Sequence, residues 1–436
     1  PAAPAPRLRY NFGDSFRGDL TLDPQGNVYV ASTSNSANFP GLAAGAYRGG
    51  PADAMVVSLD STLGRVRWTT AVGGSGEDAA YSIERDVVSG DLFVSGGTNS
   101  PDLGGAAGGY QATLSGNVDG FVARLQAGGG QLVQATYLGT AQYDQAYFVR
   151  RGPTHVNFVY VLGQTAGAWP GLTPGLFQNL DGRQFIQQLT DSLRRPGFGT
   201  VFGAGRAMPD ISPTAFEVDC AGRIYLAGWG GGRNLNGGNT QGLPTTPNAL
   251  QPASDGRDFY LMQLSDGAQV LDYATFFGTS ADDHVGGGTS RFDPQGTLYQ
   301  ALCACQGTRG LPMPPGAHYY ANTNLAPQCD NAAFKMTLGP GSASTGPDTV
   351  SVCARVGAIR LGGSPAGGTW TGPLVTGSVT NGFFFTPDTL QPGQFTLTYT
   401  SPLAGLCAGT TTRRITVLPQ VRATLRTPQD TFCLVR

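Results

Sequence analysis

The stretch DPQGNVYVAS, residues 23–32, decides the fold, because its parts recur along the chain. It joins a tight turn to a strand. In the turn, Pro presets φ at the second position and Gly takes a positive φ. In the strand, apolar and polar residues alternate. The same combination returns as DPQGTLYQAL at residues 293–302. Such self-similarity between distant segments is typical of a repeat architecture.

The strand that follows the turn has five copies, which align on one aromatic residue. These residues stand 64, 67, 65 and 74 positions apart: Tyr29, Phe93, Tyr160, Tyr225 and Tyr299. Each period also holds a first strand before the turn, a third strand that ends in Leu and a fourth that ends in Gly. Four antiparallel strands in about 65 residues describe one blade of a β-propeller. Packing the blades in a ring covers the sheet faces and most strand edges.

The last period lacks a fourth strand, because a Gly- and Ser-rich stretch follows Leu338. Residues 10–13, YNFG, resemble the fourth strands of other periods, such as YLG at 137–139. We therefore predict that residues 8–13 supply the outer strand of the last blade and close the ring. The expected five-bladed propeller covers residues 8–340 after a linker at 1–7, with blades at 18–83, 84–149, 150–216, 217–290, and 291–339 plus 8–13.

From Asp348 the period stops, and short strands separated by turns predict an Ig-like β-sandwich over residues 348–418. A linker at 341–347 precedes it, and residues 419–436 resemble the start of a further module. Cys353 lies near the first strand of this domain and Cys407 just before its last. A disulfide between them would stabilise a small core. The predicted fold class is therefore all-β, a propeller followed by a sandwich.

The seven cysteines include no C-x-x-C pair and suit an oxidising compartment better than a zinc site. Cys303 and Cys305 end a second strand, and Cys329 precedes the third strand of the same blade. We prefer the pair Cys305–Cys329, with Cys303–Cys329 left open. Cys220 lies at the opposite strand ends, roughly 20 Å away, which is too far for a disulfide to Cys303 or Cys305. Because seven cysteines cannot all pair within the chain, one has no partner, and Cys433 is the natural candidate.

Composition and motifs exclude several function classes. The net charge is −2 and Lys335 is the only Lys, so no basic footprint for nucleic acid exists. No apolar run approaches about 18 residues, and we expect no membrane span. The motifs HExxH, GxSxG and the P-loop are missing, and the three His (His155, His284 and His318) are scattered. We predict no catalytic residue, metal or cofactor.

A set of acidic residues recurs between the fourth strand of one blade and the first strand of the next: Asp78, Asp144, Asp210 and Asp283. In a propeller these loops share one face and could form a polar cup for a ligand. The alternative is that each Asp accepts backbone N–H bonds and fixes its own turn. Trp229, beside a Gly- and Asn-rich loop, is a candidate platform for a sugar, with core packing as the alternative.

The repeats, with GNVYVAS, NSANFP, DAMVVSL and GGSGEDAAYSI, resemble the SBBP-type β-propeller repeats of secreted bacterial proteins. YQALCAC, LPMPPGAHYYANTN and CDNAAFKM are similar to segments of large multidomain surface proteins of gliding bacteria. SPAGGTWTGP and PGQFTLTYT are similar to the Ig-like modules of those proteins. The resemblance implies a cell-surface or extracellular protein that carries PKD or Ig-like modules, is secreted by the type IX system and is linked to gliding motility.

We therefore predict a non-enzymatic structural or adhesive module. Its propeller would display binding loops on an Ig-like stalk for a surface glycan or a protein, and self-association into a fibre is a variant of this prediction. The alternative is a carbohydrate-active enzyme whose catalytic carboxylates lie in the cup. The sequence does not name the ligand or the assembly state.

Overall fold

The computed structural model describes residues 8, 11–43, 46–152, 157–232, 234, 237–285, 290–293, 296–305, 311–312, 329–338, 349–354, 357–363, 367–387, 392–401 and 409–419. The linker predicted at 341–347, His155, His318, Cys407 and Cys433 lie outside these ranges. The chain forms two compact units, residues 1–339 and 340–436, each of which is described by itself.

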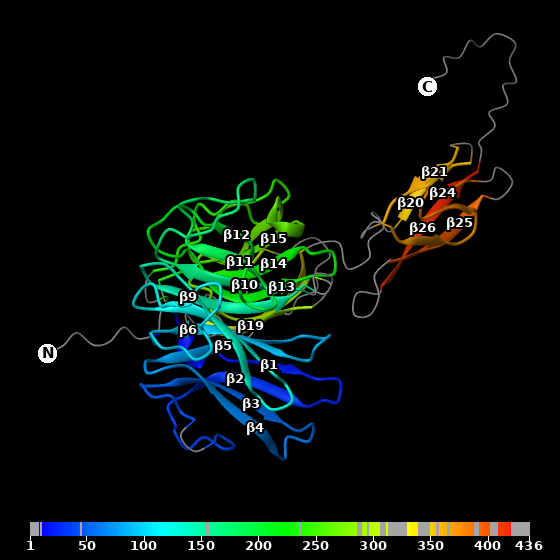
Figure 1. Ribbon diagram of the computed structural model, residues 1–436. Helices are drawn as coiled ribbons and strands as arrows, with labels where there is room; N and C mark the ends of the chain where they lie inside the picture. Colours follow the sequence, from blue (N-terminus) through cyan, green and yellow to red (C-terminus); the bar gives the residue numbers. More distant parts are fainter. Residues whose placement is uncertain are drawn as a thin grey trace, which may run out of the picture. The chain divides into compact units, whose positions relative to one another are not determined.

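Within the first unit, the described strands form five antiparallel sheets in chain order (Figure 1). The first sheet holds β1 (Asp19–Leu22), β2 (Val28–Ser34), β3 (Asp53–Leu59) and β4 (Val66–Val72). The second holds β5 (Asp78–Arg85), β6 (Leu92–Thr98), β7 (Asp119–Leu125) and β8 (Leu132–Leu138). The third holds β9 (Asp144–Arg151), β10 (Phe158–Thr165), β11 (Gln184–Thr190) and β12 (Pro196–Phe202).

The fourth sheet holds β13 (Ser212–Val218), β14 (Ile224–Trp229), β15 (Phe259–Leu264) and β16 (Leu271–Phe277). The fifth holds β17 (Arg291–Phe292), β18 (Thr297–Cys305) and β19 (Cys329–Thr337). In every sheet each strand pairs with the next one along the chain, which is the up-and-down order of a propeller blade. The first strands contact one another in the sequence β1, β5, β9, β13 and β17.

The recurring turn and aromatic residue belong to one hydrogen-bonded device. At the first turn the Asp23 carboxylate accepts the Asn27 N–H at 2.9 Å, and the Tyr29 hydroxyl donates to the same carboxylate at 3.1 Å. Gly26 takes a φ of 78°, as the turn requires. The Tyr225 hydroxyl donates to Asp219 in the same way, at 3.0 Å. In these copies the tyrosine hydroxyl anchors the turn, which links the recurring turn to the recurring strand; Phe93, in the second copy, has no hydroxyl for this role.

Leu8 and residues 11–13, which are the described part of this segment, do not form the predicted outer strand. Among the described residues the fifth sheet has three strands, and residues 11–13 form a turn before the 3-10 helix η1 (Asp14–Phe16). The Leu8 carbonyl accepts the Tyr81 hydroxyl at 3.0 Å, and the Asn11 amide donates to the Tyr147 hydroxyl at 2.8 Å and to Gln164 at 2.9 Å. The opening segment therefore inserts among the first strands of the sheets, where its polar side chains find partners that an edge strand would not offer.

The first and fifth sheets meet through the Arg291 side chain instead. Its guanidinium donates to the Asp19 carboxylate and, at 3.4 Å, to the Leu20 carbonyl. Side chains on the strands near this junction are more exposed than the matching side chain of the third sheet. Leu20 and Tyr299 keep 49% and 45% of their exposure, whereas Tyr160, the counterpart of Tyr299, keeps 1%. We name the junction of β1 with β17 the seam.

The second unit consists of two described sheets. One orders its strands as β20 (Thr349–Cys353), β26 (Thr410–Leu418), β25 (Gly393–Thr400) and β22 (Thr369–Thr371). The other orders them as β21 (Ile359–Leu361), β24 (Gly382–Phe385) and β23 (Val375–Ser378). Both sheets contribute to one apolar core, which includes Leu361, Trp370, Phe385, Leu397 and Ile415.

The predicted disulfide between Cys353 and Cys407 is wrong, because Cys353 is a free, exposed thiol. β20 pairs parallel with β26, which places Cys353 opposite Leu418 at the far end of that strand. Cys407 itself lies outside the described residues.

The preferred pair Cys305–Cys329 stays a prediction, because the disulfide partner of Cys305 lies outside the described residues. Cys305 is disulfide-bonded and stands directly opposite Cys329 in the β18–β19 register, whereas Cys303 is free. The open alternative through Cys303 is therefore wrong. The Cys329 side chain lies outside the described residues. Cys220 is also disulfide-bonded.

Candidate functional site

The first strands of the sheets begin at the end of the unit that carries the long connections. Asp78 and Asp144 are the first residues of β5 and β9, Asp210 precedes β13, and Asp283 precedes the bridge between His284 and Cys303. The structure therefore places all four predicted acidic residues at one end of the first unit. Each of these aspartates is buried, with at most 1% of its surface exposed.

The first two aspartates bind the turns that lead into their own strands. The Asp78 carboxylate accepts the Gly74 N–H at 2.9 Å and the Ser100 hydroxyl at 2.9 Å. The Asp144 carboxylate accepts the N–H and the hydroxyl of Thr140, at 2.6 and 2.8 Å. These contacts favour the alternative in which each carboxylate fixes its own turn.

The other two aspartates repeat this geometry. Asp210 accepts the Ala204 N–H at 2.8 Å and the Arg206 guanidinium at 2.6 Å. Asp283 accepts the Thr279 N–H at 2.6 Å and the Cys305 N–H at 3.1 Å. Because these carboxylates bond to the loop backbone, their contacts also favour the turn-fixing alternative.

A second aspartate lies beside three of these four. Asp53 and Asp78 both lie close to Gly73, which follows β4. A Cβ placed there would come within 2.4 Å of the Asp78 carboxylate and 3.2 Å of Asp53. Burial, with the Asp78 charge adding to it, raises the pKa of Asp53 to about 6. Burial likewise raises the pKa of Asp119, beside Asp144, to about 6. The pKa of Asp283, beside Asp258, is also raised to about 6 by burial.

These raised pKa values predict that the first unit is more stable at mildly acidic pH. Between about 3.9, the pKa of an unfolded Asp, and 6, the native state holds more protons than the unfolded state. The free energy of unfolding therefore falls as the pH rises through this window. Burial opposes a lowering of the pKa of Asp23 and Asp86, but their hydrogen bonds prevail and lower both pKa values. The stability that these two groups contribute is lost only as the pH falls below about 3.8, so they do not affect this window.

We expect the melting temperature of the first unit to be roughly 3 °C or more higher at pH 5 than at pH 7.5. Differential scanning calorimetry across this range measures the shift. Asn at positions 53, 119 and 283 should flatten the slope, because an amide does not titrate. A melting temperature that rises with pH over the same window would contradict the proposed protonation.

Trp229 offers no surface to a ligand. It is fully buried, with 0% exposure, and belongs to an apolar core cluster. Its ring centroid lies 6.4 Å from that of Phe12 and 5.8 Å from that of His284. The structure therefore favours the core-packing alternative for this residue.

A groove that sequence reasoning missed lies beside these loops. It has a volume of about 420 Å³ and is lined by Leu250, Gln251, Pro252, Asp255, Asp258, Gly278, Thr279, Ser280 and Pro312. Gln251 braces it, because its side-chain oxygen accepts the Gly278 N–H at 3.0 Å. Gln111 makes the same bond to Gly139 in the second sheet, at 3.0 Å. This Gln recurs before the third strand of both sheets. Its recurrence is the sequence signal that could have located this side of the groove.

A charged cluster centred on the buried Arg150 joins the first strands, and we name it the ionic cluster. Its members are Asp19, Glu84, Arg150, Glu217 and Arg291, with one residue from each sheet. Arg150 lies 3.5 Å from Asp19, 3.9 Å from Glu84 and 3.8 Å from Glu217. Burial raises the pKa of both glutamates, and Arg150 opposes that shift.

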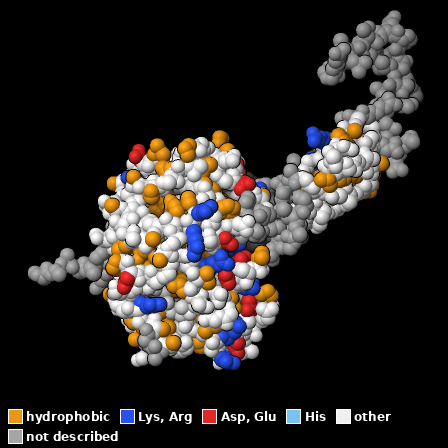
Figure 2. Space-filling view, viewed as in Figure 1, with side chains coloured by type: hydrophobic (Ala, Val, Ile, Leu, Met, Phe, Trp, Pro, Cys, Tyr) orange, Lys and Arg blue, Asp and Glu red, His pale blue; other side chains and the backbone are white. Residues whose placement is uncertain are grey.

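Figure 2 shows the visible face of the first unit, on which acidic and basic side chains gather next to each other and large areas carry no charge. Among the described residues, no group of three or more His, Cys, Asp or Glu side chains has the arrangement of a metal site. The described helices include none with the length and apolarity that a bilayer crossing demands.

Comparison with solved structures gives weak likenesses, of which two are described. Sqt1 from Chaetomium thermophilum is 11% identical, with 70% of this chain and 69% of that chain covered and a TM-score of 0.30. A quinohemoprotein alcohol dehydrogenase from Pseudomonas putida is 11% identical, with 93% and 67% covered and a TM-score of 0.29. Scores this low support no conclusion about fold or activity.

No curated protein matches the chain. One family model does match, and it covers β1, the turn at Asp23 and β2 together with the first residues after β2. Over residues 18–40 the chain is similar to the SBBP family, described as a β-propeller repeat, and this agrees with the four-stranded sheets that the structure shows.

Proposed function

We propose that this chain is a non-enzymatic, extracellular or cell-surface module whose propeller displays binding loops. The observation that carries the proposal is the use of the four recurring aspartates. They are fully buried and bonded to the backbone of their own turns, so they make the loops rigid. Rigid loops bind with a small loss of conformational entropy. The proposed binding site is the groove beside Gln251.

We also propose how the two units are built, what they bind and where the protein resides. The five sheets form a five-bladed ring, and the two sheets of the second unit form an Ig-like stalk domain. A surface glycan or another protein chain is the partner, and self-association into a fibre remains a variant. The disulfide at Cys305 suits an oxidising compartment. Type IX secretion and a part in gliding motility extend the proposal from the family resemblance.

The enzyme alternative requires two carboxyl groups that reach one glycosidic bond, about 5–9.5 Å apart. The acids that recur at the loop-bearing end are buried and hydrogen-bonded. In the groove, Asp255 is exposed and Asp258 is buried. A loop-displaying binding module is compatible with this arrangement, because it does not need two accessible carboxyl groups that face the same bond.

The test blocks the groove with one large side chain. Ser280 is an exposed lining residue, so S280W should fill the opening and weaken binding to any glycan retained on a printed array by about tenfold or more. A141W is the matched control, because Ala141 holds the equivalent exposed position after Gly139 and Thr140 in the second sheet. It should leave binding unchanged.

The same proteins are assayed for release of reducing ends from a panel of polysaccharides. We expect none from the wild-type chain. Hydrolysis that disappears in a folded D255N variant would favour the enzyme. Binding that survives S280W would show that the ligand docks elsewhere.

A further inference from the structure

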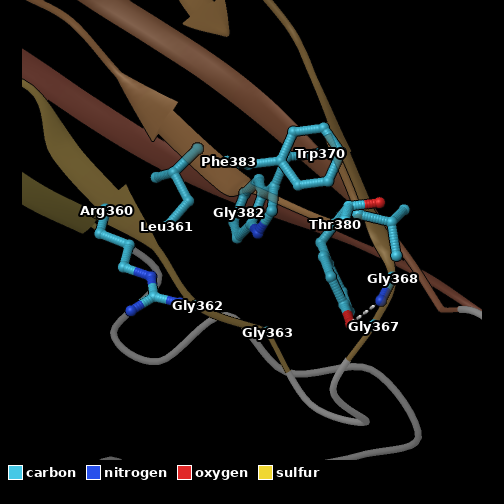
Figure 3. A pocket seen from close by; sticks show the side chains of 12 residues that line it. Arg360, Leu361, Gly362, Gly363, Gly367, Gly368, Trp370, Thr380, Gly382 and Phe383 are labelled. Atoms are coloured by element: carbon cyan, nitrogen blue, oxygen red, sulfur yellow. Dashed lines mark hydrogen bonds between the residues drawn. The ribbon is translucent and has the colours of Figure 1, made fainter. Parts of the chain in front are cut away.

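A second cavity lies in the other unit. It has a volume of about 430 Å³ and lies beside β21, with lining residues from β22, β24, β25 and the turn between β23 and β24. Three aromatic side chains contribute to its wall: Trp370, Phe383 and Tyr399. Arg360 and Thr380 are its exposed polar side chains (Figure 3). A cavity of this size falls within the range of small-molecule sites.

The wall around Tyr399 is fixed by glycines. A Cβ at Gly363 or Gly368 would come within 2.4 Å of the Tyr399 ring, so a side chain at either position would have to displace the ring. The Tyr399 hydroxyl also accepts the Gly368 N–H at 3.0 Å, which Figure 3 marks. The cavity is therefore a built feature of the unit and not a gap between loose side chains.

The lining of this cavity includes one buried donor without a partner among the described residues. Trp370 keeps 3% of its exposure, and its indole N–H has no hydrogen-bond partner among the described residues. A buried donor without a partner costs free energy, and a ligand oxygen would remove that cost. The Arg360 Nε lies 3.5 Å from the place where a Cβ on Gly382 would stand, so the guanidinium borders the same opening.

The charge and the surface of the wall define the class of ligand. The described lining includes Arg360 and no Asp or Glu, so it carries one positive charge. Guanidinium groups bind carboxylates through paired N–H donors. Aromatic side chains beside such a group provide an apolar surface for the C–H face of a ring.

We propose that this cavity binds an acidic sugar, a hexuronic acid unit of a glycan. The sugar carboxylate accepts from the Arg360 guanidinium, a ring or hydroxyl oxygen accepts the Trp370 N–H, and the pyranose ring packs against Phe383. This site is independent of the groove beside Gln251, because it lies within the second unit and shares no residue with that groove.

The experiment titrates the full chain with trigalacturonic acid by isothermal calorimetry, with neutral galactotriose as the comparison ligand. R360A should weaken binding of the acidic trisaccharide at least tenfold, since it removes a charge-assisted pair. R360K should fall between the wild type and R360A, because Lys keeps the charge but not the fork of donors. W370F, which deletes the N–H, should weaken binding several-fold.

R414A is the matched control, because Arg414 is an exposed Arg on β26 of the same unit and does not line the cavity. It should bind as the wild type does, and S280W should also leave this binding unchanged. The proposal fails if R360A binds as tightly as R414A, if galactotriose binds as well as the acidic trisaccharide, or if no heat is detected at millimolar ligand. None of these outcomes bears on the groove.

Discussion

Arg150→Ala is expected to cost the first unit about 3–5 kcal/mol of unfolding free energy at pH 7.5, because it breaks buried ion pairs on one side only. The Arg150 side chain keeps 5% of its exposure and lies 3.5 Å from the Asp19 carboxylate. It also donates to the Ser82 hydroxyl at 2.9 Å. Removing it leaves Asp19, Glu84 and Glu217 close together with only Arg291 to balance them.

The loss should be smaller at pH 5. Burial already raises the pKa of Glu84 and Glu217, and deleting Arg150 removes the charge that opposes this rise. Since burial already raises the pKa of Glu84 to about 8 in the wild type, the extra proton uptake on folding comes from Glu217, and the stability of the variant relative to the wild type improves as the pH falls. Urea unfolding of both proteins at the two pH values measures the difference.

Arg291→Ala is the control within the ionic cluster. The Arg291 side chain keeps 45% of its exposure, so its deletion should cost about 1 kcal/mol or less, as for an exposed ion pair. If Arg150→Ala costs no more than Arg291→Ala, the ionic cluster does not hold the first strands together in the way that the structure indicates.

Asp14→Ala is expected to have the second large effect, also about 3–5 kcal/mol, because it isolates a buried guanidinium. The Asp14 and Arg17 side chains pair at 2.9 Å with 0% and 1% exposure. Asp14 also accepts the Asn11 N–H at 2.7 Å and the Tyr147 hydroxyl at 3.0 Å. Arg17 in turn donates to the Pro213 carbonyl at 2.9 Å. The loss of Asp14 therefore weakens the anchoring of the whole opening segment.

A double-mutant cycle separates the ion pair from simple packing. Arg17→Met in the Asp14→Ala background removes the stranded charge, so the double variant should be more stable than Asp14→Ala alone. Denaturant unfolding of the wild type, the two single variants and the double variant gives the coupling energy. A coupling energy near zero would show that the two side chains act independently.

The repeated strands were predictable because their hydrophobic period depends only on local sequence. The turn at Asp23 and the strand through Tyr29 recur with their spacing intact, and their hydrogen bond is local. The position of Asn11 is not predictable in this way. The motif YNFG resembles an outer strand, but the fate of Asn11 depends on Tyr147 and Gln164, which are more than a hundred residues away.

The candidate site shows the same division. The aspartates at positions 78, 144, 210 and 283 were found from their spacing, but only their burial and bonds distinguish a turn-fixing role from a binding role. The ionic cluster was missed although a signal exists. Glu84, Arg150 and Glu217 occupy matching positions near the ends of successive first strands. A sequence cannot show by itself that those ends converge.

In the proposed ring, the seam is the junction that a partly exposed side chain spans. A closed circle of sheets resists tension because no sheet can leave without separating from two neighbours. Here Arg291, which is partly in water, carries the described side-chain contact between β1 and β17. Under pulling force, or during thermal fluctuation, the circle should part at this point first and turn into an open arc, with amide hydrogens of β1 and β17 exchanging before those of β5 or β9.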